Sequence, residues 1–256
     1  MLRVLRTALL VVAGCGRLGF EARVDADAQS DAQRADAVRG AYAQLVLSDG
    51  PAAYWRFEES GGMVALDETG NYPGTFTGAL TRGAGIAGGR GAVFDGSSTR
   101  LEVGDVFGFS GTVPYTLEVW AMPSVVNASV RFIVDRSSAA RPVDGYQLYY
   151  AQSFTLHARS VGGAEGGYAG GAGIAAGRWT HIVATYDGMQ DNLFIDGVLV
   201  ASTIAPALPA PSAGAFTIGD VGSGNFNKYL GVLDEVAIYP TALPAVRVAA
   251  HAAAGR

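Results

Sequence analysis

The sequence predicts an all-β protein in which two antiparallel sheets pack face to face and a short C-terminal helix follows. From Leu45 onward, short apolar or alternating runs recur, and each is closed by Gly, Asp, Asn, Ser or Pro. That pattern is typical of β-sandwiches. The chain holds 36 glycines among 256 residues, which suits many turns and disfavours long helices. Because 49% of the residues are apolar and 16% are charged, a large core can form.

The predicted elements follow one another from residue 52 to the end of the sequence. Strands are predicted at residues 52–58, 92–104 (AVFDG with RLEVG), 116–123, 131–137, 145–151, 154–160, 178–187, 192–202, 215–220 and 233–240. Residues 243–255, LPAVRVAAHAAAG, predict a helix with Pro244 in its first turn and Gly255 as its stop. No linker interrupts residues 45–256, which indicates one domain.

The N-terminus has the features of a secretory signal. Two arginines precede an apolar stretch at residues 8–13, which is too short to span a bilayer as a helix. The tetrad VAGC, which ends at Cys15, resembles the lipobox of bacterial lipoproteins, in which the signal is cut before a cysteine that is then lipidated. We therefore expect residues 1–14 to be a signal peptide and Cys15 to carry the lipid. An ordinary buried cysteine is the alternative.

The lipobox resemblance also implies that the protein is located in the cell envelope. No aspartate follows Cys15, which in Gram-negative bacteria favours the outer membrane over retention at the inner one. Acyl chains would anchor the protein to the membrane without threading it through. Residues 15–44 are rich in Ala, Asp, Gln and Arg and poor in large apolar residues, so they predict a flexible tether after the lipid. The sandwich then occupies residues 45–256.

Several stretches, in this order, resemble the laminin-G-like, concanavalin-A-like jelly-roll domains. They are YWRFEE, LDETGN, VFDGSSTRLEV, YTLEVWAMPS, RWTHIVATYDG, NLFIDGVLVAS, FTIGD and LDEVAIYPTALP, and the resemblance covers about residues 46–254. It implies a concanavalin-A-like antiparallel β-sandwich with variable loops at the rim. It also implies that the domain is displayed by a secreted or cell-surface protein.

Asp196 and Gly197 predict a hairpin corner. They separate the apolar pairs Phe194-Ile195 and Val198-Leu199. A type I′ turn needs positive φ at both central positions, and Asp followed by Gly tolerates that best. A catalytic or metal-binding role for Asp196 is the alternative, and the turn is favoured.

Two glycine-rich stretches predict loops. Residues 83–88, GAGIAG, match the dinucleotide fingerprint G-x-G-x-x-G, but a strand follows them where the fingerprint requires a helix. Residues 162–177 are also rich in glycine and predict a long loop at the rim.

No catalytic residues are predicted, and the protein is not expected to be an enzyme. There is no G-x-S-x-G nucleophile motif, and the three histidines, His157, His181 and His251, lie far apart in the sequence. A glycosidase would need two carboxylates that flank the scissile bond. Glu118 could border a groove, since it shares a strand face with Trp120, but no paired carboxylate motif accompanies it.

A calcium ion is the one cofactor that the sequence suggests. Calcium prefers oxygen ligands gathered by loops, and Asp67 and Asn71 lie in the turn-rich stretch LDETGN. The family resemblance implies that an acidic residue of the last core strand contributes, and Asp234 matches that position. The alternative is that Asp67 forms a turn and that backbone amides satisfy Asp234.

The expected function is non-catalytic binding of a glycan or of a cell-surface protein. The net charge of −5 disfavours nucleic acid. Tyr149, Tyr150 and Tyr168 could stack on sugar rings, although aromatic residues are also ordinary core material. Two alternatives stay open: a structural or adhesive envelope protein without a small ligand, and a glycoside-active enzyme.

Overall fold

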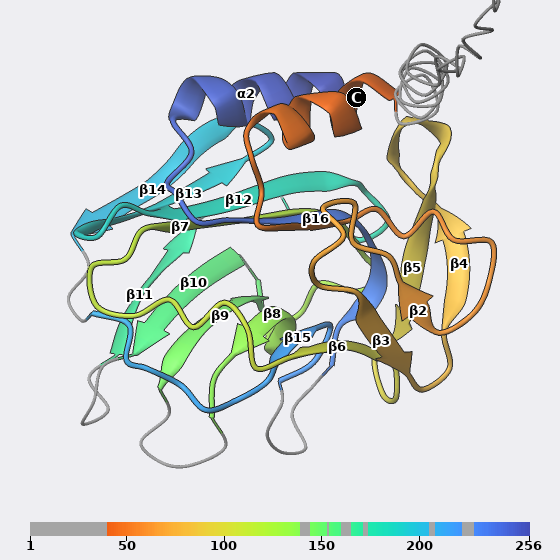
Figure 1. The fold of residues 1–256 in the computed structure, drawn as a ribbon, viewed down its shortest axis with the longest axis horizontal. Coiled ribbons are helices and arrows are strands. Elements are labelled where there is room, and N and C mark those ends of the chain that lie inside the picture. The colour runs from red at the N-terminus through yellow and green to blue at the C-terminus, as the bar shows by residue number, and fades with distance from the viewer. Residues whose placement is uncertain are drawn as a thin grey trace, which may run out of the picture. The chain divides into compact units, whose positions relative to one another are not determined.

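The computed structural model describes residues 40–138, 144–152, 154–159, 165–170, 174–204, 208–221 and 228–256. Within them, two sheets of eight strands each form a sandwich. Figure 1 shows the two layers, with helices on the outer side of one of them. All of the strand pairs described are antiparallel except one isolated bridge. The predicted fold class is therefore confirmed.

The first sheet, sheet A, has the strand order β14-β13-β12-β7-β16-β5-β4, and β1 pairs with the end of β16. Its strands are β1 (Ala53–Trp55), β4 (Thr81–Ala84), β5 (Arg90–Asp95), β7 (Tyr115–Pro123), β12 (Thr180–Tyr186), β13 (Gln190–Ile195), β14 (Val198–Ile204) and β16 (Leu230–Tyr239). The central strands β12, β7 and β16 are buried along almost their whole length.

The second sheet, sheet B, has the order β11-β10-β9-β8-β15-β6-β3-β2. Its strands are β2 (Val64–Ala65), β3 (Gly74–Thr77), β6 (Arg100–Gly104), β8 (Arg131–Arg136), β9 (Gly145–Tyr150), β10 (Phe154–Arg159), β11 (Glu165–Gly170) and β15 (Phe216–Ile218).

The main core lies between the sheets and is rich in aromatic rings. Along β7, alternate side chains enter it, since Tyr115, Leu117 and Val119 belong to this cluster. Tyr115 stacks on Tyr146 of sheet B with ring centroids 4.8 Å apart. Aromatic side chains bury large apolar areas, so such pairs hold the two sheets together.

A second apolar cluster covers the outer face of sheet A. It includes Trp120 of β7 and Val248 of α2 (Ala245–Ala254), a helix that lies over the sheet (Figure 1). Pro244 precedes α2, and the N–H of Gly255 ends it by donating to the carbonyl oxygen of His251. The predicted C-terminal helix is thus confirmed.

Residues 41–48 form another helix on the same face, although the sequence assigned residues 41–44 to the tether. Tyr42, Ala43 and Val46 are buried against sheet A. These apolar residues have helical spacing, but they lie on both sides of residue 45, where the sequence predicted that the domain begins. They also form only a short apolar face. The packing partner, not the local sequence, stabilises this helix.

Four strands arise where none was predicted, namely β2, β3, β4 and β11. β4 includes Gly83 and Ala84 of the glycine-rich stretch, and the rest of that stretch turns into β5. β11 lies within residues 162–177, which were predicted to be a loop. Glycine has low strand propensity, so pairing with β10 decides the conformation there. In the described residues, no helix is long and apolar enough to cross a membrane.

Candidate binding pocket

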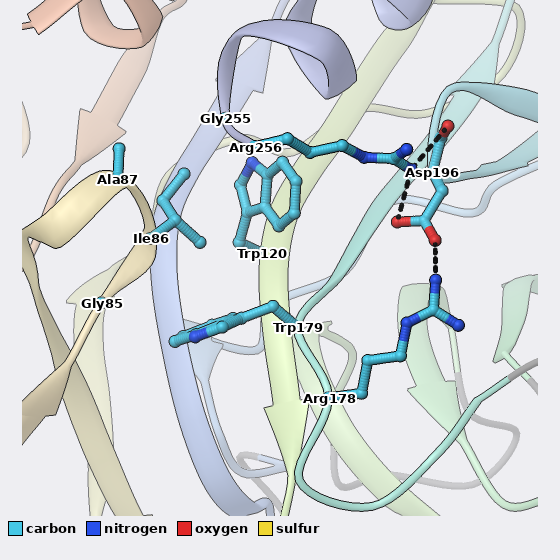
Figure 2. A pocket seen from close by; sticks show the side chains of 9 residues that line it. All are labelled: Gly85, Ile86, Ala87, Trp120, Arg178, Trp179, Asp196, Gly255 and Arg256. Carbon is cyan, nitrogen blue, oxygen red and sulfur yellow. Dashed lines mark hydrogen bonds and ion pairs between the residues drawn. The ribbon is translucent and has the colours of Figure 1, made fainter.

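A pocket of about 450 Å³ opens where the end of α2 meets the edge of the outer face of sheet A. Segments far apart in the sequence supply its walls. It is lined by Gly85, Ile86, Ala87, Trp120, Arg178, Trp179, Asp196, Gly255 and Arg256 (Figure 2). The pocket therefore exists only once β7, the β12–β13 region, the 85–87 turn and the end of α2 have come together.

Two tryptophans form its aromatic wall. Trp120 lies on the outward face of β7, while Trp179 directly precedes β12 and is partly exposed. The Trp120 side chain is almost fully buried, yet its indole Nε1–H has no hydrogen-bond partner in the described part of the chain. Buried polar groups are nearly always paired, so this unpartnered donor is unusual.

Close packing sets the position of the Trp120 ring. A Cβ atom added at Gly255 would lie 2.4 Å from the Cζ2 atom of Trp120, so only glycine fits there. The ring of His181 lies on the other side, 5.0 Å from the Trp120 ring centroid to centroid. Trp120 is thus held in one orientation beside the pocket.

Asp196 lies at the hairpin corner and faces the pocket. Its φ of 54° and the φ of 82° at Gly197 are both positive, as the predicted type I′ corner requires. The N–H of Asp196 donates to the carbonyl oxygen of His181 over 2.8 Å, and its Oδ1 accepts from the N–H of His181 over 3.1 Å. The turn prediction is confirmed, and the same residue also places a carboxylate at the pocket mouth.

Two arginines flank that carboxylate. Nη2 of Arg178 donates to Oδ2 of Asp196 over 2.8 Å, and Nη2 of Arg256 lies 3.5 Å from Oδ1 (Figure 2). Both arginine side chains are more than half exposed, whereas that of Asp196 is 18% exposed. Exposed ion pairs add little to stability, so these charges are available for other contacts.

The turn at residues 85–89 closes the pocket on the side of sheet A nearest β16. The N–H of Ile86 donates to Oδ2 of Asp234 over 2.8 Å, and the N–H of Glu235 donates to Oδ1 over 2.9 Å. Gly85 permits this approach, since a Cβ there would lie 2.4 Å from Oδ2 of Asp234. Burial and the charge of Glu235 raise the pKa of Asp234 well above its usual range. Asp234 thus supports the pocket wall from behind.

Glu118 does not border a groove, contrary to the sequence-based expectation. It is fully buried beneath the helices, where its two oxygens accept hydrogen bonds from Tyr42, Tyr239, His181 and His251 over 2.8–3.0 Å. The helices cover this face of sheet A, and the alternation of β7 could not reveal that cover. A carboxylate without solvent access cannot act on a substrate.

His181 and His251 meet at Glu118, although 70 residues separate them in the sequence. Nε2 of His251 also lies 2.8 Å from Oδ2 of Asp49, which in turn binds Arg247. The sequence analysis missed this cluster. The one available signal was that Arg247 and His251 lie four residues apart, on one face of a helix.

The carboxylates of the predicted calcium ligands Asp67 and Asp234 accept hydrogen bonds within the described part of the chain. The oxygens of Asp67 accept hydrogen bonds from the backbone N–H groups of Tyr54, Thr69, Asn71 and Tyr72 and from the Thr69 hydroxyl. Those donors occupy the lone pairs that calcium would need. Asn71 is exposed in the same turn, whereas Asp234 lies in β16 and is bound as described above. Among the residues described, no group of three His, Cys, Asp or Glu side chains could hold a metal ion.

The remaining candidates lie elsewhere. Tyr150 is buried in the core between the sheets, while its neighbour Tyr149 is half-buried on the outer face of sheet B. Tyr168 lies in β11, whose side chains are outside the described part of the structure, and Cys15 also lies outside the described residues. Neither Tyr149 nor Tyr150 lines the pocket.

Comparison with known families agrees with this architecture. The profile of the concanavalin A-like lectin/glucanases superfamily (laminin G type) matches residues 95–249, which is more than half of the chain. The chain belongs to this superfamily. Its match spans β7, β12 and the Asp196 corner, and so includes four of the nine residues that line the pocket, Trp120, Arg178, Trp179 and Asp196. No match was found among curated proteins.

Solved structures with the superfamily fold share low identity with this chain. Domain 4 of an extracellular GH43 arabinanase from Geobacillus stearothermophilus, in complex with arabinotriose, has a TM-score of 0.62 at 22% identity, over 79% of this chain and 98% of that one. The binding domain of paraclostridial mosquitocidal protein 1 has a TM-score of 0.68 at 15% identity, over 80% of this chain. The ligand-binding domain of botulinum neurotoxin serotype D, in complex with N-acetylneuraminic acid, has a TM-score of 0.63 at 10% identity, over 82%. This chain spans 52% of each of the two toxin domains.

Proposed function

We propose that this protein is a non-catalytic binding module of the bacterial cell envelope and that it holds carbohydrate in the pocket at Trp179. The observation that carries the proposal is the composition of the pocket. A partly exposed tryptophan and charged hydrogen-bonding groups converge on one cavity. Sugar rings offer an apolar face and a rim of hydroxyl groups, and this combination matches both.

The similar structures support the proposal without supplying its details. One is in complex with arabinotriose, and another is in complex with N-acetylneuraminic acid. At their level of identity they show that this fold is used to bind sugars in other proteins. The position of the site in this chain rests on the pocket itself.

The absence of a suitable acid pair supports a non-catalytic role. Glycoside hydrolysis requires two carboxyl groups on either side of the scissile bond. Among the described residues that line the pocket, Asp196 has the only side-chain carboxylate, and two arginines pair with it. Glu118 and Asp234, which lie behind the walls, are fully buried.

Calorimetric titration with neutral and charged oligosaccharides, chosen from a glycan array, tests the proposal. Trp179→Ala should weaken binding about tenfold, because it removes the exposed stacking surface. Tyr149→Ala is the matched control, since it removes a half-buried aromatic ring from the outer face of sheet B. Circular dichroism must show that both variants are folded. Loss of binding in Tyr149→Ala alone would move the site to sheet B.

A protein partner is the second candidate, and the edge strand β14 favours it. Val198, Leu199 and Ile204 are all at least half exposed on this strand, which has β13 on one side as its hydrogen-bonding neighbour. An apolar edge strand is a surface on which another chain can pair. Capture of a defined surface protein that is lost in Leu199→Lys, together with no glycan signal, would favour this function.

The proposed location in the cell envelope rests on the N-terminal sequence alone. In this proposal the signal ends at Gly14, the lipid is attached to Cys15, and the chain up to the helix at residues 41–48 serves as a tether from the outer membrane. Calcium is not required for the proposed pocket.

A further inference from the structure

The charged groups of the pocket carry a further inference about its ligand. Among the nine lining residues, the charged side chains are those of Arg178, Arg256 and Asp196, that is, two guanidinium groups and one carboxylate. The arginines are 58% and 57% exposed, whereas the carboxylate is 18% exposed. A ligand that enters the pocket therefore meets the positive groups first.

Most guanidinium donors of this pair are unused within the described part of the chain. Each guanidinium has five N–H groups. Arg178 makes one hydrogen bond, to Oδ2 of Asp196, and Arg256 makes one contact at 3.5 Å with each of two Asp196 oxygens. The remaining N–H groups can bind a second carboxylate, and a guanidinium does so best with two parallel hydrogen bonds.

Asp196 fixes the place of the two arginines. Its own backbone is held by the hairpin corner and by two hydrogen bonds with the backbone of His181. Its carboxylate is therefore a fixed anchor, and Figure 2 shows Arg178 and Arg256 reaching it from opposite sides. The anchor holds the guanidinium groups beside the tryptophan wall.

We propose that the pocket selects carbohydrates that carry a carboxylate, such as uronate-containing oligosaccharides. This rests on the proposed carbohydrate-binding function and names its ligand class. The sugar ring lies against Trp179 and the ligand carboxylate binds the outer N–H groups of Arg178 and Arg256. A neutral sugar makes the first contact but not the second.

Calorimetric titration of the whole domain with trigalacturonate and with its carboxyl-reduced counterpart tests this inference. The two probes have the same linkages and differ in charge alone. Trigalacturonate should bind about tenfold more tightly, which corresponds to one charged hydrogen-bonded contact. The difference should shrink as salt rises from about 0.05 M to about 0.5 M, because exposed charges are screened.

Three variants separate the roles of the charged groups. Arg178→Gln and Arg256→Gln should each reduce the preference for trigalacturonate and leave the reduced trisaccharide unaffected. Asp196→Asn should reduce the preference for trigalacturonate, because the two arginines lose the carboxylate that positions them, while asparagine still suits positive φ. Arg100→Gln, on sheet B, removes the same charge far from the pocket and should change nothing.

The two proposals fail in different ways. Equal affinity for both trisaccharides in the wild type, or a preference that survives in the Arg178→Gln/Arg256→Gln double variant, would overturn the inference and keep the carbohydrate site. Binding of neither probe, or binding that Trp179→Ala does not weaken, would overturn the carbohydrate site as well.

Discussion

At the scale of single residues, Glu118 and His251 form the main buried charge pair of this protein. Burial acts against the ionised form of Glu118, but hydrogen bonds from His181 and His251 outweigh it and hold the pKa of Glu118 well below its usual range. Each ring nitrogen of His251 lies within 3.0 Å of a carboxylate oxygen, from Glu118 or Asp49. Ionised carboxylates only accept hydrogen bonds, so both nitrogens carry hydrogen and the ring is positively charged.

This charge predicts a pH-dependent contribution of His251 to stability. Burial lowers the pKa of His251, but the hydrogen bonds and charges of Glu118 and Asp49 raise it above 6.5. The stabilisation that the charge of His251 provides is therefore complete below its unfolded-state pKa of about 6.5. It is lost as the pH rises through its folded-state pKa. His251→Gln should lower the free energy of unfolding by about 3 kcal/mol near pH 6 and by less at alkaline pH. Urea unfolding across this range measures the difference.

A second variant in the same cluster provides the control. Tyr42→Phe removes one hydrogen bond to Glu118 but no charge that titrates near neutrality. It should lower the free energy of unfolding by about 1 kcal/mol, equally at all of these pH values. Parallel pH profiles of the wild type and His251→Gln would show that His251 is not charged in the folded protein.

Asp67 gives a prediction about calcium. The Asp67 carboxylate already accepts hydrogen bonds from four backbone N–H groups. Treatment with a chelator should therefore leave the melting temperature of the domain unchanged. A fall that added calcium restores, and that Asp67→Asn abolishes, would instead support the calcium site that the sequence suggested.

At the scale of elements, the β13–β14 corner and α2 are fitted closely to each other. A Cβ at Gly197 would lie 2.9 Å from the Cβ of Ala252 and 3.1 Å from the Cα of Ala249. Gly62 has a similar φ, 86° against 82°, but has nothing within 4 Å. The two glycines therefore share their backbone requirement and differ in packing.

Gly62 and Gly197 therefore predict different losses of stability when each is replaced by alanine. Gly62→Ala should lower the free energy of unfolding by about 1 kcal/mol, which is the cost of positive φ. Gly197→Ala should add an overpacking cost and lose about 2–4 kcal/mol in total. Chemical denaturation of both variants measures the costs. Equal losses would show that α2 shifts freely away from the corner.

The elements also show where local patterns are informative. Strong alternation in apolar runs predicted the central strands β7, β12, β13 and β16, and the structure contains all of them. β11 and the helix at residues 41–48 were missed because a neighbouring element stabilises each of them. Propensity is a weak guide wherever tertiary contacts decide.

At the scale of the whole molecule, the sandwich accounts for residues 41–256, and the N-terminal segment gives the last prediction. In a Gram-negative host, the full-length protein should incorporate a labelled fatty acid and fractionate with the outer membrane. Cys15→Ser should abolish the label. Gly16→Asp should keep the label and move the protein to the inner membrane, because an aspartate after the lipidated cysteine favours retention there.

Two outcomes would contradict this prediction. Fatty-acid incorporation that persists in Cys15→Ser would show that Cys15 is not the attachment point. An unchanged outer-membrane location of Gly16→Asp would show that the residue after Cys15 does not decide the address of this protein.

The sequence by itself determined the fold class, the positions of the central strands along the chain and the Asp196–Gly197 corner, because short-range periodicity and turn chemistry are properties of neighbouring residues. Tertiary structure alone decided the pocket and the Glu118 cluster. Trp120, Trp179, Asp196 and Arg256 lie up to 136 residues apart (256 − 120) and converge only after folding. The alternation of β7 placed Glu118 and Trp120 on one face, but only the packing of the folded chain buries both and places Trp120 beside a pocket.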